Sequence, residues 1–185
     1  SSYASENVSM CNNTLNEVAG QINQLETEIN RLDAKIQQLE DKIASSESKK
    51  RSLQNSLPGL ERNLQATEQE ILSLNEQLRA LQAQLSRTDD PHEKDAILAQ
   101  IASVNSQLRN AERQREELQY KISETKREIS EWESQIANMK SEKRRCEQER
   151  EEKNNKLNRT RSKYEKLKST FNSLNSEFQT LTAAS

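Results

Sequence analysis

The stretch SRTDDPHEKDA, residues 86–96, lies near the middle of this 185-residue chain and separates two long runs of apolar residues at helical spacing. Asp90 can cap a helix N-terminus, Pro91 suits the first helical position, and Glu93 follows three residues after the cap, as in a capping box. A residue before proline disfavours the helical backbone conformation. We therefore predict that one helix ends before Asp90 and another begins at Pro91.

Before this stretch, seam residues recur alternately every three and four positions over more than eleven heptads. A repeat sustained this long predicts a coiled coil, because it keeps one apolar stripe on one helix face. The seam consists of Val8, Cys11, Leu15, Val18, Ile22, Leu25, Ile29, Leu32, Ile36, Leu39, Ile43, Ser46, Lys50, Leu53, Leu57, Leu60, Leu64, Thr67, Ile71, Leu74, Leu78, Leu81, Leu85 and Thr88.

A second seam follows the stretch and is displaced by two residues from the phase of the first. One regular helix therefore cannot carry both seams. The second seam consists of Lys94, Ile97, Ile101, Val104, Leu108, Ala111, Arg115, Leu118, Ile122, Thr125, Ile129, Trp132, Ile136, Met139, Lys143, Cys146, Arg150, Lys153, Leu157, Thr160, Tyr164, Leu167, Phe171, Leu174, Phe178 and Leu181.

The two seams define arms of nearly equal length, at about residues 8–88 and 94–181, with a turn at about 89–93. Equal arms on either side of a break are what a hairpin requires. We predict an all-α fold, a long antiparallel coiled-coil helical hairpin in which residues 1–185 form one elongated domain.

Antiparallel pairing places core positions of the two arms in shared layers when the partner residue numbers sum to 182. This register pairs Leu78 with Val104 and places Lys50 beside Trp132, where an ammonium group can reach the indole face.

Charge gives a second indication of the register. Residues 140–168 hold twelve Lys or Arg and six Glu, whereas their predicted partners, residues 14–42, hold six acidic and three basic residues. Complementary flanks favour this pairing over slipped ones. The basic segment is also the one candidate for nucleic-acid contact, but its interleaved glutamates and the net charge of −2 argue against that partner.

Pro58-Gly59 interrupts the first arm, and in a helix interior proline costs about 3 kcal/mol and glycine about 1 kcal/mol. The seam keeps its phase across this site, which favours a kink in a continuing helix. The alternative is an additional turn at Pro58-Gly59 that gives a three-helix arrangement.

The section of the first arm with the most regular apolar seam faces the most polar section of the second arm. We predict that this mismatch leaves apolar surface for a second copy and that the hairpin dimerises into a four-helix section. In the alternative, long Lys and Arg stems cover that surface. The candidate self-association face is Leu15, Ile22, Leu25, Ile29, Leu32, Ile36, Leu39 and Ile43.

The two cysteines, Cys11 and Cys146, both lie on seam positions. The register places Cys11 beside Phe171, about 37 Å along the coil from Cys146, which excludes a disulfide within one hairpin. They are interpreted as small buried apolar residues or, alternatively, as sites of an intermolecular disulfide.

The composition argues against several classes of protein and of functional site. With 31% apolar and 3% aromatic residues the chain cannot build a compact globular core, and no run approaches the roughly 20 apolar residues of a membrane span. The single histidine, His92, excludes histidine-based triads and multi-histidine metal sites, and two isolated glycines cannot form a phosphate-binding loop. We therefore expect no enzyme activity, no catalytic residue, no cofactor and no metal.

The expected function is structural: a spacer, scaffold or self-assembling fibre subunit that acts through helix–helix packing. Self-association is the first partner interaction expected, followed by contact with another coiled-coil or helical protein. The alternative is a protein-binding adaptor, secreted ligand or effector that uses exposed helix faces.

Overall fold

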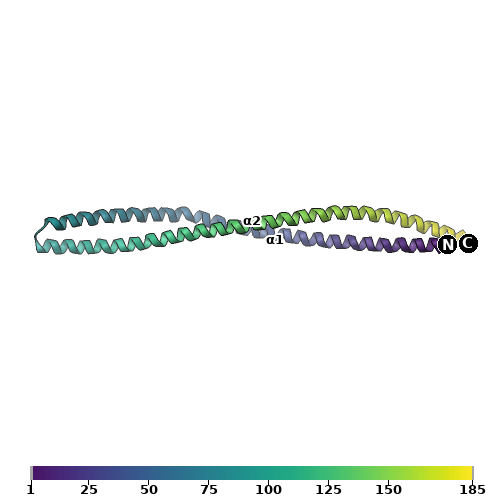
Figure 1. Cartoon of the computed structure of the whole chain (residues 1–185), viewed down its shortest axis with the longest axis horizontal. Helices are drawn as coiled ribbons and strands as arrows, with labels where there is room; N and C mark the ends of the chain where they lie inside the picture. Colours follow the sequence, from purple (N-terminus) through teal and green to yellow (C-terminus); the bar gives the residue numbers. More distant parts are fainter. Residues whose placement is uncertain (1, 185) are drawn as a thin grey trace. The chain divides into compact units, whose positions relative to one another are not determined.

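The computed structural model describes residues 2–184 and contains two α-helices, α1 (Ser2–Arg87) and α2 (Pro91–Ala184), of 86 and 94 residues. The described residues contain no strand. The two helices run in opposite directions and lie side by side (Figure 1). The predicted all-α antiparallel hairpin is confirmed.

The hairpin divides into two compact units. The first consists of the chain up to Ala44 together with the chain from Ala137 onward, and the second consists of Ser45–Ile136. Each unit is a two-helix antiparallel coiled coil with one segment from α1 and one from α2. The bend between the helices belongs to the second unit.

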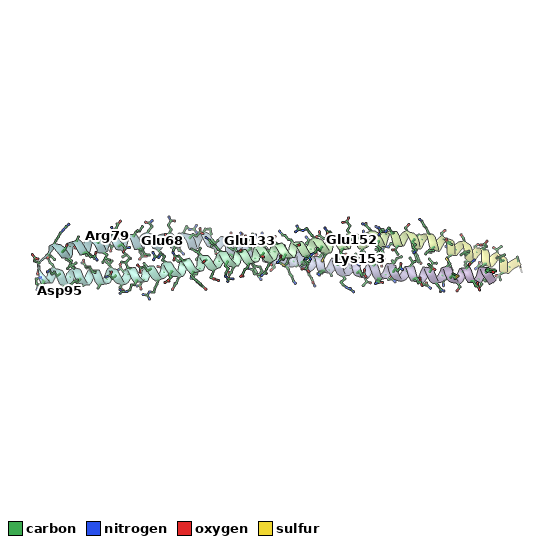
Figure 2. All side chains as sticks on the ribbon, in the orientation of Figure 1. Glu68, Arg79, Asp95, Glu133, Glu152 and Lys153 are labelled. Atoms are coloured by element: carbon green, nitrogen blue, oxygen red, sulfur yellow. The ribbon has the colours of Figure 1, made fainter. Side chains whose placement is uncertain are left out.

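Burial follows the heptads. Every buried residue among those described lies on one of the two predicted seams. Apart from Lys94 and Leu181, the remaining seam residues are at least half-buried. Glu68, Arg79 and Glu133, which are charged and lie away from the seams, are exposed and project outward (Figure 2). The two stripes therefore cover each other within each unit, since burial of apolar surface drives helix pairing.

The second unit contains the larger core. Its buried residues include a group that we call the apolar cluster: Ile71, Leu74, Val104, Leu108 and Ala111, against which Leu78 and Leu81 pack. In the first unit, Leu25, Ile29 and Leu157 form a smaller cluster together with Ile22. Both clusters join residues whose numbers sum to 182, such as Leu74 with Leu108 and Leu25 with Leu157, in agreement with the predicted register.

The turn between the helices spans residues 88–90. As predicted, α2 begins at Pro91, and Asp90 caps it: its Oδ1 accepts the His92 N–H at 3.1 Å, while its carbonyl accepts the Lys94 N–H at 2.9 Å. The predicted capping-box role of Glu93 is wrong. The Thr88 hydroxyl donates to the Glu93 carboxylate and accepts the Asp90 N–H at 3.3 Å, so Thr88 occupies the position that Glu93 would need.

Helix α1 continues through Pro58, so the three-helix alternative with a turn at Pro58-Gly59 is wrong. Pro58 is exposed, whereas Leu57 and Leu60 on either side of it remain half-buried in the seam. The proline ring therefore lies on the side of α1 that faces away from α2. Packing of the flanking leucines compensates for the backbone hydrogen bond that proline cannot make.

The ammonium group over the Trp132 ring comes from Lys49 and not from Lys50, which the register places beside the ring. Lys49 places its Nζ 5.1 Å from the centroid of the Trp132 ring, while Lys50 is half-buried in the seam. Lys49 flanks the seam, and a flanking side chain can reach across the partner helix to a ring face, where a cation is favourable.

Candidate functional site

The most polar part of the interface lies in the first unit, where Lys143, Arg150 and Lys153 occupy seam positions and are half-buried. Their aliphatic stems lie along the seam, and their charged ends reach acidic side chains of α1. We call residues 26–40 of α1 and 142–161 of α2 the charged seam.

Lys153 and Glu28 form the least exposed of these pairs. Lys153 Nζ donates to Glu28 Oε2 at 2.7 Å, and each side chain is 28% exposed. This hydrogen bond lowers the pKa of the Glu28 carboxyl, and it raises the pKa of the Lys153 ammonium, because it favours the charged form of both groups. Both groups are therefore held in the charged state around neutral pH.

Arg150 and Lys143 make similar contacts further along. The Arg150 guanidinium binds both carboxylate oxygens of Asp33, with Nη2 at 3.5 Å from Oδ2, and this contact raises the pKa of Arg150. Lys143 Nζ lies 3.3 Å from Glu40 Oε1 and 3.6 Å from Glu147 Oε1, so it bridges the two helices.

Two more pairs flank the seam. Arg161 Nη2 lies 2.7 Å from Glu26 Oε1, and Lys35 Nζ lies 3.2 Å from Glu142 Oε1. The Glu142 hydrogen bond raises the pKa of Lys35, and the nearby Cys146 adds to that effect. Ion pairs thus join the acidic segment of α1 to the basic segment of α2, as the charge distribution predicts.

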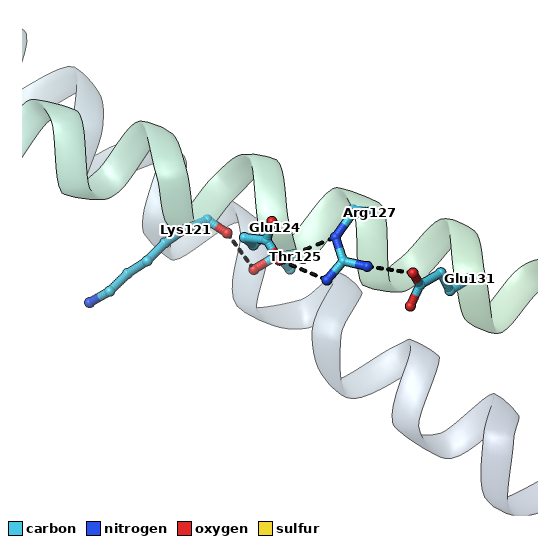
Figure 3. A network of polar contacts seen from close by, with 5 residues as sticks. All are labelled: Lys121, Glu124, Thr125, Arg127 and Glu131. Atoms are coloured by element: carbon cyan, nitrogen blue, oxygen red, sulfur yellow. Dashed lines mark hydrogen bonds and ion pairs between the residues drawn. The ribbon is translucent and has the colours of Figure 1, made fainter.

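Arg127 in the second unit forms a network of another kind (Figure 3). Its guanidinium binds Glu124 at 2.8 Å and also binds Glu131, while Thr125 donates to the Lys121 carbonyl at 2.7 Å. The Glu124 hydrogen bond raises the pKa of Arg127, and the same bond lowers the pKa of Glu124. All of these residues belong to α2, so the network supports one helix without fixing the register between two.

The eight residues of the candidate self-association face all lie in the seam of the first unit. Five of them, Leu15, Leu25, Ile29, Leu39 and Ile43, are buried. The other three, Ile22, Leu32 and Ile36, are half-buried. Within one chain α2 already covers much of this face, with Leu157 in one cluster with Leu25 and Ile29. Contact of these residues with a second copy stays a prediction.

Both cysteines are free thiols. Cys146 is buried, and the half-buried Cys11 places its Sγ 3.7 Å from the Leu167 carbonyl oxygen, 21 residues from Cys146 and so about 30 Å away along α2. An intermolecular disulfide stays a prediction. Non-reducing electrophoresis of Cys11→Ser and Cys146→Ser would show which thiol, if either, forms it.

Residues 2–184 offer no site of two other kinds. Within that range no group of three or more His, Cys, Asp or Glu side chains could hold a metal ion. No described helix has a stretch apolar and long enough to traverse a lipid bilayer. His92 is exposed in the first turn of α2, where its backbone N–H binds the cap.

The acidic partners in the charged seam were not identified individually from the sequence. Glu28 stands immediately before a core position, and Asp33 and Glu40 stand immediately after one. These flanking positions are where coiled coils place interhelical ion pairs, so heptad position is the signal that could have found them.

Comparison with protein-family models and with curated proteins gives no match for this sequence. Among solved structures, the chain resembles a coiled-coil segment of Smc from Pyrococcus yayanosii, with a TM-score of 0.51 and 13% identity over 99% of this chain and 81% of that one. At this identity the likeness concerns the fold, a coiled-coil helical hairpin.

Proposed function

We propose that this chain is a structural scaffold that acts as a spacer or as a self-assembling fibre subunit through helix–helix packing. The main support for the proposal is that two helices account for residues 2–87 and 91–184. The register between them is specified in two ways, by apolar layers and by interhelical ion pairs. Such a specification is useful where position along a coiled coil matters, because each slipped register would bury unpaired charge.

We also propose that the two units form a single folding domain. Both helices run without interruption across the boundary between the units, so a melted segment in one unit frays helix in the other. Thermal unfolding followed by circular dichroism and by calorimetry should give one transition. Two resolved transitions would contradict the single domain and leave the scaffold proposal standing.

Sedimentation velocity tests self-assembly. The proposal expects oligomers whose population rises from low to high micromolar concentration. A chain that stays monomeric throughout this range contradicts the self-assembling form of the proposal.

The alternative function, a protein-binding adaptor, secreted ligand or effector, is supported by a different observation. Leu72, Leu98 and Tyr120 are large apolar side chains exposed on the second unit. A monomeric chain that binds a defined helical protein, and loses that binding when these three residues are made polar, would favour the alternative.

A further inference from the structure

Charge is nearly absent from one part of the first unit. The chain holds 28 basic and 30 acidic residues, yet within residues 3–16 and 169–184 only Glu6 and Glu177 are charged. We call these two segments the charge-poor section. Their two helices are adjacent, since Cys11 near the start of α1 contacts the backbone of Leu167 in α2. The remaining side chains are mostly Ser, Asn and Thr, with apolar residues at the seam.

The seam of the charge-poor section is incompletely covered. On α2 it carries Phe171, Leu174 and Phe178, which are only half-buried, followed by the exposed Leu181. The register sets Phe171 opposite Cys11, and Leu174 opposite Val8. A thiol and an isopropyl group are too small to remove these α2 side chains from water, so apolar surface remains accessible here.

Further apolar side chains point to solvent in the same section. Tyr3 is 83% exposed, Met10 is 67% exposed and Leu181 is 48% exposed. Tyr3 and Met10 are seven residues apart and therefore lie on the same face of α1, two turns from each other. Along α2, a shallow groove of about 820 Å³ runs from Glu165 to Leu181. Within the charge-poor section its wall is formed mainly by the small polar side chains of Ser169, Asn172, Ser173, Ser176 and Thr180, together with Glu177. Glu165 and Lys168 line the end of the groove that lies outside this section.

We propose that the charge-poor section of one chain binds the same section of a second copy and forms a four-helix section. Two identical surfaces of high charge repel each other, whereas this surface carries one acidic residue on each helix and so meets its own copy with little repulsion. Protein interfaces are depleted of Lys, Glu and Asp in their centres and enriched in Tyr, Phe and Met, which is the composition found here.

A second copy fits this surface better than an anionic partner does. The charge-poor section contains no Lys or Arg, which nucleic acids and anionic lipid surfaces require. The small side chains along the groove allow another helix to approach closely. The inference rests on the self-association proposed above and names the surface responsible for it, which differs from the seam face already covered by α2.

The test compares two triple variants of the full chain that add the same charge. The first, Tyr3→Glu with Met10→Glu and Leu181→Glu, alters the charge-poor section. The matched control, Ala66→Glu with Ala83→Glu and Ala102→Glu, alters three exposed residues of the second unit. Because all six side chains are exposed, both variants should keep the wild-type helicity in circular dichroism.

Sedimentation equilibrium should show a dimer for the wild type and for the control. The dissociation constant of the first variant should rise at least about tenfold, because three contact side chains become like charges that face their own copies. A third variant, Tyr3→Lys with Met10→Lys and Leu181→Lys, should show a similar rise in its dissociation constant when it is measured by itself. Mixing the Glu and Lys variants should restore the dimer, which identifies the section as the contact between copies.

The alternative outcomes are distinct. If wild type and both Glu variants associate equally, the charge-poor section is not the interface, and self-association through another surface stands. If the Glu and Lys variants do not recombine, the direct contact between sections is overturned in the same way. If the wild type itself remains monomeric, both this inference and the self-assembling function are overturned.

Discussion

The apolar cluster of the second unit and the charged seam of the first unit hold the same two helices together with different side chains. In the apolar cluster, Leu74 and Leu108 are buried among aliphatic neighbours. In the charged seam, Lys153 and Arg150 take core positions, and their charged ends bind Glu28 and Asp33 at the edge of the interface. Both arrangements keep the same register.

This difference between the two regions separates the side chains that stabilise the hairpin from those that select its register. Aliphatic layers remove more apolar surface from water but differ little from one heptad to the next, so alone they discriminate weakly against a slip of seven residues. Ion pairs at partly exposed positions add little stability. A slip of seven residues nevertheless breaks the Lys153–Glu28 pair in either direction, because it sets Thr160 or Cys146 against Glu28. We therefore expect the second unit to be the more resistant to unfolding and the first unit to fix the pairing.

The largest effect is expected from shortening a core leucine. Leu74→Ala should lower the free energy of unfolding by about 3 kcal/mol, because it leaves a cavity in the apolar cluster. The matched change Leu157→Ala in the first unit should cost about 2 kcal/mol, since its cluster is smaller. Urea denaturation measures both. A larger loss for Leu157→Ala would reverse the proposed ranking of the two units.

The next effect has the opposite sign. Pro58→Ala should stabilise the second unit by about 2 kcal/mol, because alanine restores a helical hydrogen bond but makes the unfolded chain more flexible. Gly20→Ala in the first unit serves as a control, since an added methyl group there meets nothing within 4 Å, and it should stabilise by about 1 kcal/mol. Thermal unfolding of both variants measures the gain. No gain from Pro58→Ala would show that the helix carries no penalty at this site.

Loss of the helix cap should lower the free energy of unfolding by less than the changes above, and its effect should be confined to the residues near the bend. Asp90→Ala removes the acceptor for the His92 N–H and should cost about 1 kcal/mol. Hydrogen exchange should accelerate in peptides near residues 84–98 and stay unchanged in the charged seam. Faster exchange in both regions would mean that the bend controls the first unit as well.

The smallest effect is expected from pH. The lowered pKa of Glu28 means that its contribution is present above the pKa it has in the unfolded chain and is lost as pH falls through the folded value. The raised pKa of Lys153 gives a contribution that is present below its unfolded pKa and is lost as pH rises through the folded value. Exchange protection of the charged seam, corrected for intrinsic rates, should therefore be highest between these limits.

Two controls accompany the pH measurement. Protection of the apolar cluster should not follow the same profile, because none of its residues titrates. Glu28→Gln should remove part of the acid-side loss in the charged seam. Equal pH profiles in the two regions would contradict the division of roles between them.

Much of the fold could be predicted because the residues that determine it recur at regular intervals along the sequence. The two-residue phase difference between the seams and the Asp90-Pro91 signal locate the bend, and the sum of 182 relates the residues that share a layer. Seam position also predicts which residues are buried, down to Cys146 and Leu157 within an otherwise polar section. These properties depend on backbone geometry, which repeats along the chain.

The predictions that differ from the structure concern long, flexible side chains. Lys49 rather than Lys50 places its ammonium over the Trp132 ring, and Glu93 binds the Thr88 hydroxyl rather than the backbone of the cap. A long side chain at the edge of a seam can choose among several partners at similar cost, so spacing alone does not select one. At Pro58 two sequence signals oppose each other: the low helix propensity of proline and glycine penalises a continuing helix, whereas the unbroken phase of the seam favours one.

The three-residue turn imposes a rule on how this protein can change in length. Because Thr88 to Asp90 leave no slack between the helices, adding one heptad to a single helix would pair every layer beyond the insertion with the wrong neighbour. Two heptads added at facing points, one in each helix, would restore all of those layers. Lineages that lengthen or shorten this hairpin are therefore expected to do so by coupled insertions or deletions at sites whose residue numbers add to the same total.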